Sequence, residues 1–514
     1  MPLPRPSLLL VTLLFALEIA AVELPRATDK WFEVRADDIR IFSNVSPAAA
    51  QDLAREVLRM RAVIGQITNL RVRTPVTTRI FHFANQTAFA PYRDAAFPDQ
   101  PRAKSINGAF LSGEGQNIIL LRADGTHIER PVYHELIHYF VKNTVPKIPL
   151  WINEGLADFF STFRTSKEGV DTGIPIPEHV AWLRQGDLLP LRELFAVDAK
   201  SPHYNERRRS GVFYAQSWGL VHYLMLGNEK RRPQFLDFVR RTNAGETTES
   251  AFAASFGIKI AQLDREFRDY APLKTIRVGR HQAVEIKIAE PPPAAPMPHD
   301  VLLYELGQLI SSLDYSLIPN AQKFFEAALK ENPRNSAAWA YLGRVHAHHG
   351  RNTESEEAFA RAIEIGTDDS DVYVLLGRAI LERANQKTVI PQAEVLQARA
   401  LLAKAVELQP DSVLALLGHG VTYLYGDADP EPGIDDLQRA AALAPDNELA
   451  QRTLGLLRAR QFERAINAAI QRFNLGRYAE AVAQLDRLIP MITIPKMKED
   501  AQKLRDDMAK QLKR

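Results

Sequence analysis

The sequence contains no cysteine among its 514 residues. Disulfide bonds, thiolate ligands for a metal and cysteine nucleophiles are therefore excluded. The formal net charge is only +2 at pH 7, so the composition gives no indication of a nucleic-acid partner. Outside the N-terminus, no segment approaches the roughly 18 apolar residues that a membrane-spanning helix needs. What is present, 46% hydrophobic and 25% charged residues, is typical of globular protein, and the length predicts about three domains.

Residues 1–21 have the composition of an export signal. Arg5 supplies the positive flank, and residues 8–17 form an apolar run that only Thr12 interrupts. Small residues at 20–21 suit cleavage, and the apolar run is too short for a comfortable membrane span. We therefore expect the body of the protein to be exported to the periplasm or another extracytoplasmic space. An uncleaved signal, which would anchor the chain to a membrane, is the alternative.

Two histidines lie four residues apart in the segment 133–140, which reads Tyr-His-Glu-Leu-Ile-His-Tyr-Phe. In an α-helix this spacing places the imidazoles of His134 and His138 on one face. Such a pair can supply two nitrogen ligands to zinc, with Glu135 beside them as a candidate general base. A buried helix with two satisfied core histidines is the alternative interpretation of these residues.

A second helix is predicted at residues 150–160, which read Leu-Trp-Ile-Asn-Glu-Gly-Leu-Ala-Asp-Phe-Phe. Glu154 follows His138 by 16 residues, so a helix, a loop and an antiparallel helix can return its carboxylate to the metal. Two His and one Glu leave a coordination position open, as catalytic zinc sites do. Asp158 could accept the outer N–H of a ligand histidine, the alternative being a solvated or capping acid. Close approach of the two helices is one explanation for Gly155.

Together these segments resemble the gluzincin branch of zinc metallopeptidases. They are most similar to the bacterial peptidase MA-like family, whose signature is HExxH followed by a helix of the form (T/S/N)EG-x-A. The resemblance covers residues 30–270 and implies that Glu135 is the base and proton shuttle. Asp158 becomes the partner that orients a ligand histidine. The implied zinc ligands are His134, His138 and Glu154.

The same resemblance implies two further parts of a site. Gluzincins stabilise the developing oxyanion with a Tyr or His, and a predicted helix at 210–224 offers Tyr214, which we prefer, and His222. A packing tyrosine and a core histidine are the alternatives. Gluzincins also hold extended substrate on the strand before the metal helix, which would make Asn117 to Leu121 the substrate-binding edge. An ordinary buried strand is the alternative there.

The region before residue 129 mixes strands with a helix at 47–66. The expected strands lie at 31–34, 39–42, 77–83, 109–111 and 117–121. We predict an α+β zincin-like metallopeptidase domain with an N-terminal α/β subdomain at 30–128 and a helical part at 129–288. Five prolines between residues 290 and 298 predict a semi-rigid linker at 289–299.

Residues 300–514 are repetitive. Leu342-Gly343 and Leu376-Gly377 are 34 residues apart, which is the tetratricopeptide (TPR) period. The series continues at Leu306-Gly307, Leu417-Gly418 and Leu454-Gly455. We predict an all-α TPR solenoid of five full repeats, a degenerate terminal unit from Phe462 to Pro490 and a polar capping helix after Lys496.

The combined prediction is an exported zinc peptidase in which Glu135 activates zinc-bound water to cleave a polypeptide substrate. The repeats would bind a protein partner or present the substrate, and no nucleic acid is involved. The main alternative is a proteolytically inactive zinc-binding domain in a TPR scaffold of the cell envelope. A zinc hydrolase acting on bonds other than peptide bonds is a second alternative.

Overall fold

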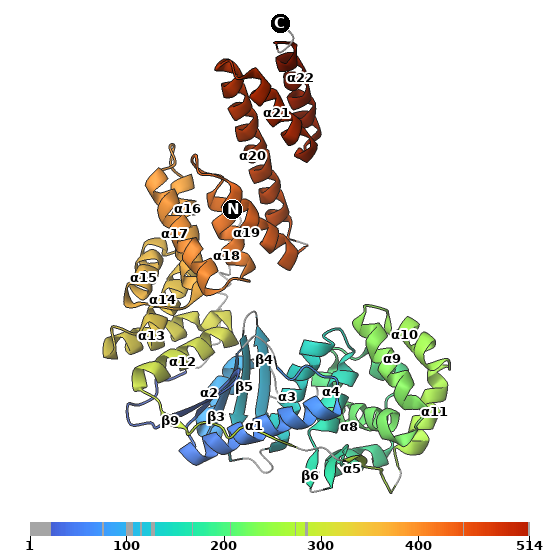
Figure 1. The fold of residues 1–514 in the computed structure, drawn as a ribbon. Coiled ribbons are helices and arrows are strands. Elements are labelled where there is room, and N and C mark those ends of the chain that lie inside the picture. The colour runs from blue at the N-terminus through green and yellow to red at the C-terminus, as the bar shows by residue number, and fades with distance from the viewer. Residues whose placement is uncertain are drawn as a thin grey trace, which may run out of the picture. The chain divides into compact units, whose positions relative to one another are not determined.

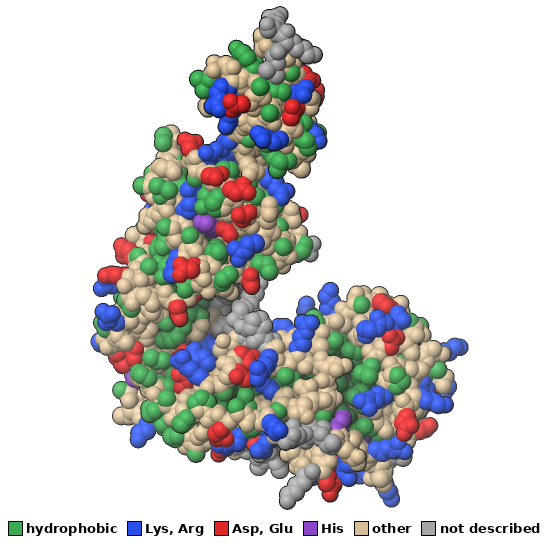
Figure 2. Space-filling model, viewed as in Figure 1, with side chains coloured by type: hydrophobic (Ala, Val, Ile, Leu, Met, Phe, Trp, Pro, Cys, Tyr) green, Lys and Arg blue, Asp and Glu red, His purple; other side chains and the backbone are tan. Residues whose placement is uncertain are grey.

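The structure is a computed structural model that forms two compact units, Met1–Phe324 and Phe325–Arg514. It describes residues 22–73, 77–98, 106–113, 116–124, 129–166, 168–205, 207–272, 274–282, 286–445 and 447–511. The predicted export signal at 1–21 lies outside these residues. Within them, none of the helices combines the length and the apolar character needed to cross a membrane. Basic and acidic side chains are interspersed on the face drawn in Figure 2, in keeping with the small net charge.

The first unit is organised around a six-stranded sheet with the order β4-β5-β3-β2-β1-β9 (Figure 1). Its strands are β1 (Phe32–Ala36), β2 (Ile39–Ser43), β3 (Thr78–Phe83), β4 (Gly108–Gly113), β5 (Gln116–Arg122) and β9 (Ala295–Pro296). Strands β2, β3 and β5 run parallel, whereas β1, β4 and β9 pair antiparallel with their neighbours. All five strands expected from the sequence are confirmed.

Helices cover both faces of this sheet. Helix α1 (Pro47–Ile67) begins after Ser46, whose side chain accepts a hydrogen bond from the Ala49 backbone N–H. Its buried face packs with α3 (Glu129–Thr144) against the isoleucines of β2, β3 and β5. Helix α2 (Gln86–Ala96) lies on the other face, where Phe83 contacts Phe89 and Tyr92. Successive side chains of a strand point to opposite faces of the sheet. Since helices cover both faces, every residue of β3 is buried.

Helix α12 (His299–Leu313) also belongs to the first unit, and a buried ion-pair cluster connects it to the sheet. Glu305 is 1% exposed, and its carboxylate pairs with Arg79 and, at 2.7 Å, with Arg40. The Arg79 guanidinium also lies over the Phe81 ring, 5.1 Å from the centroid. Opposite charges and an aromatic face thus compensate the desolvation of Arg79.

The proline-rich segment is part of the first unit as well. Its residues Ala295–Pro296 form β9 on β1, at the sheet edge where a proline is tolerated. The Met297 backbone N–H donates to Trp31 O at 2.9 Å. The unit boundary therefore falls after Phe324, inside α13 (Ile318–Glu331), and not at the predicted linker 289–299.

We expect the substitution Glu305→Gln to destabilise the first unit by about 3–5 kcal/mol, because it leaves the buried guanidinium of Arg79 without a counter-charge. Urea unfolding followed by tryptophan fluorescence would measure this change. The matched control is Arg73→Gln, since the Arg73–Asp37 pair is exposed and should contribute less than about 1 kcal/mol. Equal unfolding midpoints for the two variants would contradict the ion-pair argument.

The remainder of the first unit is helical and carries a small sheet with the order β6-β7-β8. Its helices are α4 (Leu150–Phe160), α5 (Pro177–Gln185), α6 (Leu191–Ala196), α7 (Pro202–Asn205), α8 (Arg207–His222), η2 (Tyr223–Gly227), α9 (Arg231–Asn243), α10 (Thr248–Phe256) and α11 (Ile260–Tyr270). The small sheet contains β6 (Arg164–Ser166), β7 (Gly169–Thr172) and β8 (Gly279–Gln282). Helices α4 and α8 pack closely, and α5 lies on α8.

The second unit consists of packed helical pairs. After η3 (Tyr315–Leu317) and α13 come α14 (Ser336–His348), α15 (Asn352–Ile365), α16 (Ser370–Asn385), α17 (Gln392–Leu408), α18 (Val413–Thr422), α19 (Glu431–Leu443), α20 (Glu448–Asn474), α21 (Tyr478–Leu488), η4 (Ile489–Met491) and α22 (Pro495–Gln511). The terminal unit predicted to start at Phe462 begins inside a helix, because α20 continues unbroken for 27 residues. Its residues hold good helix formers and no Gly or Pro after Gly455, so nothing ends the helix there.

Candidate metal centre

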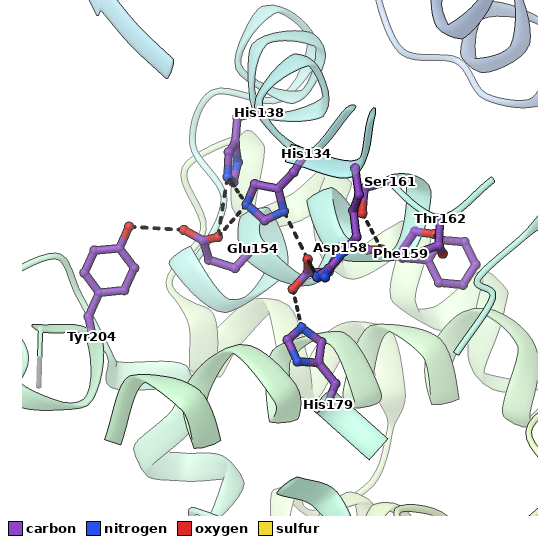
Figure 3. Close-up of polar contacts among 10 residues, drawn as sticks. His134, His138, Glu154, Asp158, Phe159, Ser161, Thr162, His179 and Tyr204 are labelled. Atoms are coloured by element: carbon purple, nitrogen blue, oxygen red, sulfur yellow. Dashed lines mark hydrogen bonds and ion pairs between the residues drawn. The ribbon is translucent and has the colours of Figure 1, made fainter. Parts of the chain in front are cut away.

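Two packed helices, α3 and α4, supply the side chains that converge in the first unit. His134 and His138 lie one turn apart on α3, and Glu154 and Asp158 lie one turn apart on α4. The apolar residues of α3, among them Leu136 and Ile137, are fully buried in the core. This packing fixes the rotation of α3 and aims both imidazoles at α4 (Figure 3).

Three ligand-type atoms form a small triangle. The Nε2 atoms of His134 and His138 are 3.0 Å apart, and each is 3.4 Å from Oε2 of Glu154. Zinc–nitrogen bonds of 2.0–2.1 Å at tetrahedral angles place neighbouring ligand atoms about 3.3 Å apart. The triangle therefore matches three of the four positions around a tetrahedral zinc ion.

The hydrogen bonding of Glu154 also fits a cation. The residue is 3% exposed, and its Oε1 accepts a hydrogen bond of 3.2 Å from the hydroxyl of Tyr204. Its Oε2 has no hydrogen-bond partner among the described residues. Burial raises the pKa of Glu154, but His138 and His134 lower it by more than burial raises it. The net shift is downward, and the carboxylate is charged. The two imidazole nitrogens lie 3.4 Å from this buried, charged oxygen, and a cation held between the three atoms would offset the cost of burying the charge.

Asp158 lies behind the triangle and holds one of its histidines. The Nδ1–H of His134 donates to Oδ1 of Asp158 at 3.1 Å, which leaves Nε2 of the ring directed at Glu154. Asp158 also accepts from His179 Nε2 at 2.7 Å and from Arg130 at 2.9 Å. Burial raises the pKa of Asp158, but His179 and His134 lower it well below its usual value. With 2% exposure Asp158 is not a solvated acid, so the structure places it in the predicted orienting position.

The triangle opens into two adjoining hollows of about 450 and about 690 Å³. Both are lined by His134, Glu135 and Tyr214, together with Gly108 of β4. Glu135 is half-buried and lines both hollows beside His134, as a general base acting there would have to. Tyr214 reaches the same space from α8.

His222 does not reach this space. Its Nε2–H donates to Gly173 O at 2.9 Å, and its Nδ1 accepts from the Tyr270 hydroxyl at 2.8 Å. Burial lowers the pKa of His222 to about 4, so the ring is neutral and both of its nitrogens are used in the interior. Of the two predicted oxyanion donors, the structure leaves only Tyr214 at the hollow.

The predicted substrate edge at Asn117 and Leu121 is wrong. Strand β5 pairs with β3 on one side and with β4 on the other, so its backbone has no free edge. Asn117 and Leu121 are both buried, as the alternative interpretation expected. The edge strand is β4, and its residues Gly108, Ala109 and Phe110 line the larger hollow. The sequence predicts that β4 and β5 form a hairpin. Which of these two strands lies at the edge of the sheet depends on the parallel pairing of β3 with β5.

Three residues of the cluster were missed by sequence reasoning. His179 comes from α5 and Tyr204 from the short helix α7, both far along the chain from the HExxH segment. Their positions depend on how α5 and α7 pack on α8, which no local pattern reveals. Arg130 lies four residues before His134, and only its buried acidic partner identifies it as part of the cluster.

Gly155 permits the close packing of α4 against α8. A methyl group at this position would lie 2.5 Å from Ser217 O and 2.5 Å from a side-chain carbon of Val221. The close approach predicted for this glycine is therefore present, but the neighbour is α8 and not the metal helix α3. Because Glu154 is the adjacent residue, this contact also sets the depth of the Glu154 carboxylate.

We expect Gly155→Ala to destabilise the first unit by about 1–3 kcal/mol and to weaken metal binding, because α4 must shift away from the Ser217 carbonyl. Thermal unfolding and a zinc titration would measure both effects. Gly455→Ala is the matched helical control, since no described atom beyond its chain neighbours and the adjacent helix backbone lies within 4 Å of its added carbon. Helix propensity alone should make that control neutral or up to about 1 kcal/mol more stable. Equal losses in both variants would contradict the packing argument.

In comparisons with known proteins, two different family models match two different segments of the chain. A tetratricopeptide-repeat family model matches residues 318–370. The helices within residues 318–370 are tetratricopeptide repeats. Residues 130–247, which include the triangle and the hollows, match a family described as a protein of unknown function (DUF1570).

Individual relatives and solved structures are similar to part of the chain. The formate-dependent nitrite reductase complex subunit NrfG of Escherichia coli O157:H7 is 26% identical over 100 residues. That match covers 19% of this chain and 48% of NrfG, so the chain spans about half the length of this curated relative. YrrB, a TPR protein with an unusual peptide-binding site, is 18% identical over 40% of this chain and 92% of YrrB, with a TM-score of 0.28. A thermophilic TPR protein of Thermus thermophilus, TTC0263, is 22% identical over 41% of this chain and 98% of its own, with a TM-score of 0.25.

Proposed function

We propose that this chain is an exported zinc-dependent peptidase whose TPR repeats bind a protein partner. One observation carries the proposal: the ligand atoms of His134, His138 and Glu154 meet at zinc-like separations beside an open hollow. An acidic residue, Glu135, borders the same hollow next to the ligands. Closed structural zinc sites have four protein ligands, whereas this cluster offers three and an opening.

The residues that would hold the ion are well suited to a divalent cation. Nε2 of His134, Nε2 of His138 and Oε2 of Glu154 are the three donors, and Asp158 keeps the His134 proton on Nδ1. Zinc, when bound, supplies a Lewis acid that makes water more acidic and polarises a carbonyl group.

Glu135 and Tyr214 supply the proton chemistry in this proposal. The Glu135 carboxylate accepts a proton from water as the water oxygen bonds to the scissile carbonyl carbon. It then delivers that proton to the amide nitrogen, whose bond to carbon breaks so that an amine leaves. The Tyr214 hydroxyl, at the same hollow, donates a hydrogen bond to the carbonyl oxygen as negative charge develops.

The edge strand β4 would align the substrate. An edge strand presents unpaired backbone N–H and C=O groups, and an extended polypeptide can pair with them. Phe110 of β4 lines the larger hollow and Trp182 of α5 the smaller one, so apolar substrate side chains would be accommodated on both sides of the ligands. This geometry favours an unfolded polypeptide segment as substrate. The repeats would bind a protein that delivers or regulates it.

The test combines metal content with proteolysis of an unfolded protein by the purified full chain. We expect stoichiometric zinc and cleavage products in mass spectrometry, loss of cleavage on removal of the metal by a chelator, and recovery on zinc addition. Zinc binding without cleavage of any unfolded substrate would leave a zinc-binding TPR scaffold instead. Absence of zinc binding would overturn the proposal entirely.

A further inference from the structure

Four helices of the second unit share one pattern. Each starts after a side chain that caps its backbone: Asn335, Asp369, Ser412 and Asn447. Each carries a glycine eight residues after that cap: Gly343, Gly377, Gly420 and Gly455. The equivalent glycine of α18 is therefore Gly420, and not Gly418 as the sequence series has it.

In three of these helices the glycine is covered by the following helix. A carbon added at Gly343 would lie 2.6 Å from the Phe359 ring of α15. The corresponding distances are 2.8 Å from Gly377 to Leu402 and 2.6 Å from Gly420 to Leu437. The glycine is thus a notch that receives a large apolar side chain from a second helix. At Gly455 no described atom beyond its chain neighbours and the adjacent backbone of α20 lies within 4 Å of the same position.

The notch is open because, within the part of the chain that the structure describes, no second helix packs on the first half of α20. Ala450, Leu454 and Leu457 pack on α18 and α19, whereas α21 packs on the second half of α20, around Phe462 and Ala469. Figure 1 shows α20 running past α19 with α21 and α22 at its far end. The first half of α20 thus takes the place of the first helix in one repeat, and its second half takes that place in the next repeat. The second helix that would normally separate these two is missing from the described residues.

The exposed side of this first half is apolar. Leu449 is 55% exposed and Leu456 is 49% exposed, one on either side of Arg452. The positions equivalent to Leu456 are Arg344 in α14, Arg378 in α16 and Val421 in α18, so α18 and α20 are apolar here and α14 and α16 are not. Arg452 is exposed, and none of the described acidic residues forms an ion pair with it. The surface formed by Leu449, Arg452, Gly455 and Leu456 is called the α20 notch below.

We propose that the α20 notch binds an acidic amphipathic helix of a partner polypeptide, with a large apolar side chain over Gly455. The three covered glycines show what fits such a notch: in each case an α-helix that presents Phe or Leu. The unpaired Arg452 favours negative charge on the incoming helix. This inference rests on the part of the proposed function that assigns partner binding to the repeats, and it is independent of peptide cleavage.

Helix α15 provides a probe, because it covers the equivalent Gly343 and carries four Glu and one Arg. We would measure the fluorescence anisotropy of a labelled synthetic peptide of residues 352–365 mixed with the full chain. We expect saturable binding that weakens about tenfold or more when the peptide carries Phe359→Ala, or when the chain carries Leu456→Glu. Leu475→Glu is the matched control, since Leu475 is 75% exposed at the far end of α20 and should leave binding unchanged.

Circular dichroism establishes that each variant is folded. Absence of binding, or equal binding by the Leu456→Glu and Leu475→Glu chains, would overturn the proposal. Self-association of the chain that Leu456→Glu abolishes would assign the α20 notch to a second copy and would also overturn it. Glu154→Ala should bind the peptide as the wild type does, so a failure of the metal centre and a failure of the α20 notch can be told apart.

Discussion

Glu135→Gln should lower peptide cleavage by about 10²–10⁴-fold while zinc stays bound, because the amide keeps the shape of the side chain but cannot take up a proton. Glu135 borders the hollow without belonging to the ligand triangle of His134, His138 and Glu154, so the metal donors are left intact. Initial rates on an unfolded protein, measured beside the zinc content of the same preparation, would test this expectation.

Glu178→Gln is the matched control for this substitution. Glu178 lines the smaller hollow too, but it is exposed and comes from α5. We expect nearly wild-type rates from it, because its carboxylate is not at the ligand triangle. Equal activity of Glu135→Gln and the wild type would remove the assignment of Glu135 as base, whatever the metal content shows.

Glu154→Ala should reduce zinc affinity by more than about 100-fold, because it removes one of the three donors, whereas loss of a group that only orients a ligand costs about 10–100-fold. Asp158→Asn provides that milder comparison, since it keeps all three donors and changes only the acceptor of His134 Nδ1–H. Competition against a chromophoric zinc chelator would rank the wild type, Asp158→Asn and Glu154→Ala in that order. Unchanged affinity in Glu154→Ala would mean that the metal, if any, binds elsewhere.

The residues that the sequence identified are those whose relation is local. His134 and His138 share a helix face because of the helical period, and Glu154 and Asp158 do so for the same reason. One loop joins the two helices, so their packing could be anticipated. Tyr214 could be placed only by resemblance, yet it does line the hollow.

The errors arose where non-local pairing decides the outcome. Strand β5 loses its edge because β3, nearly forty residues earlier in the chain, pairs with it in parallel. His222 lies on the same helix as Tyr214, but its side chain leaves the helix on a different face and contacts Gly173 and Tyr270. The length of α20 was missed because the repeat period predicts a turn that the residues after Gly455 do not provide. Periodicity describes which face of an element is buried, and it does not describe which other element covers that face.

The buried pair between Arg79 and Glu305 constrains how the chain can be divided for expression. A fragment ending at the prolines would lack α12, and its sheet would carry an uncompensated guanidinium beneath a bare apolar face. Such a fragment would be prone to aggregate, and its inactivity would say nothing about the chemistry of the metal centre. Fragments that extend beyond Glu331 retain α12 and the whole of α13, and they are the ones on which cleavage without the remaining repeats can be measured.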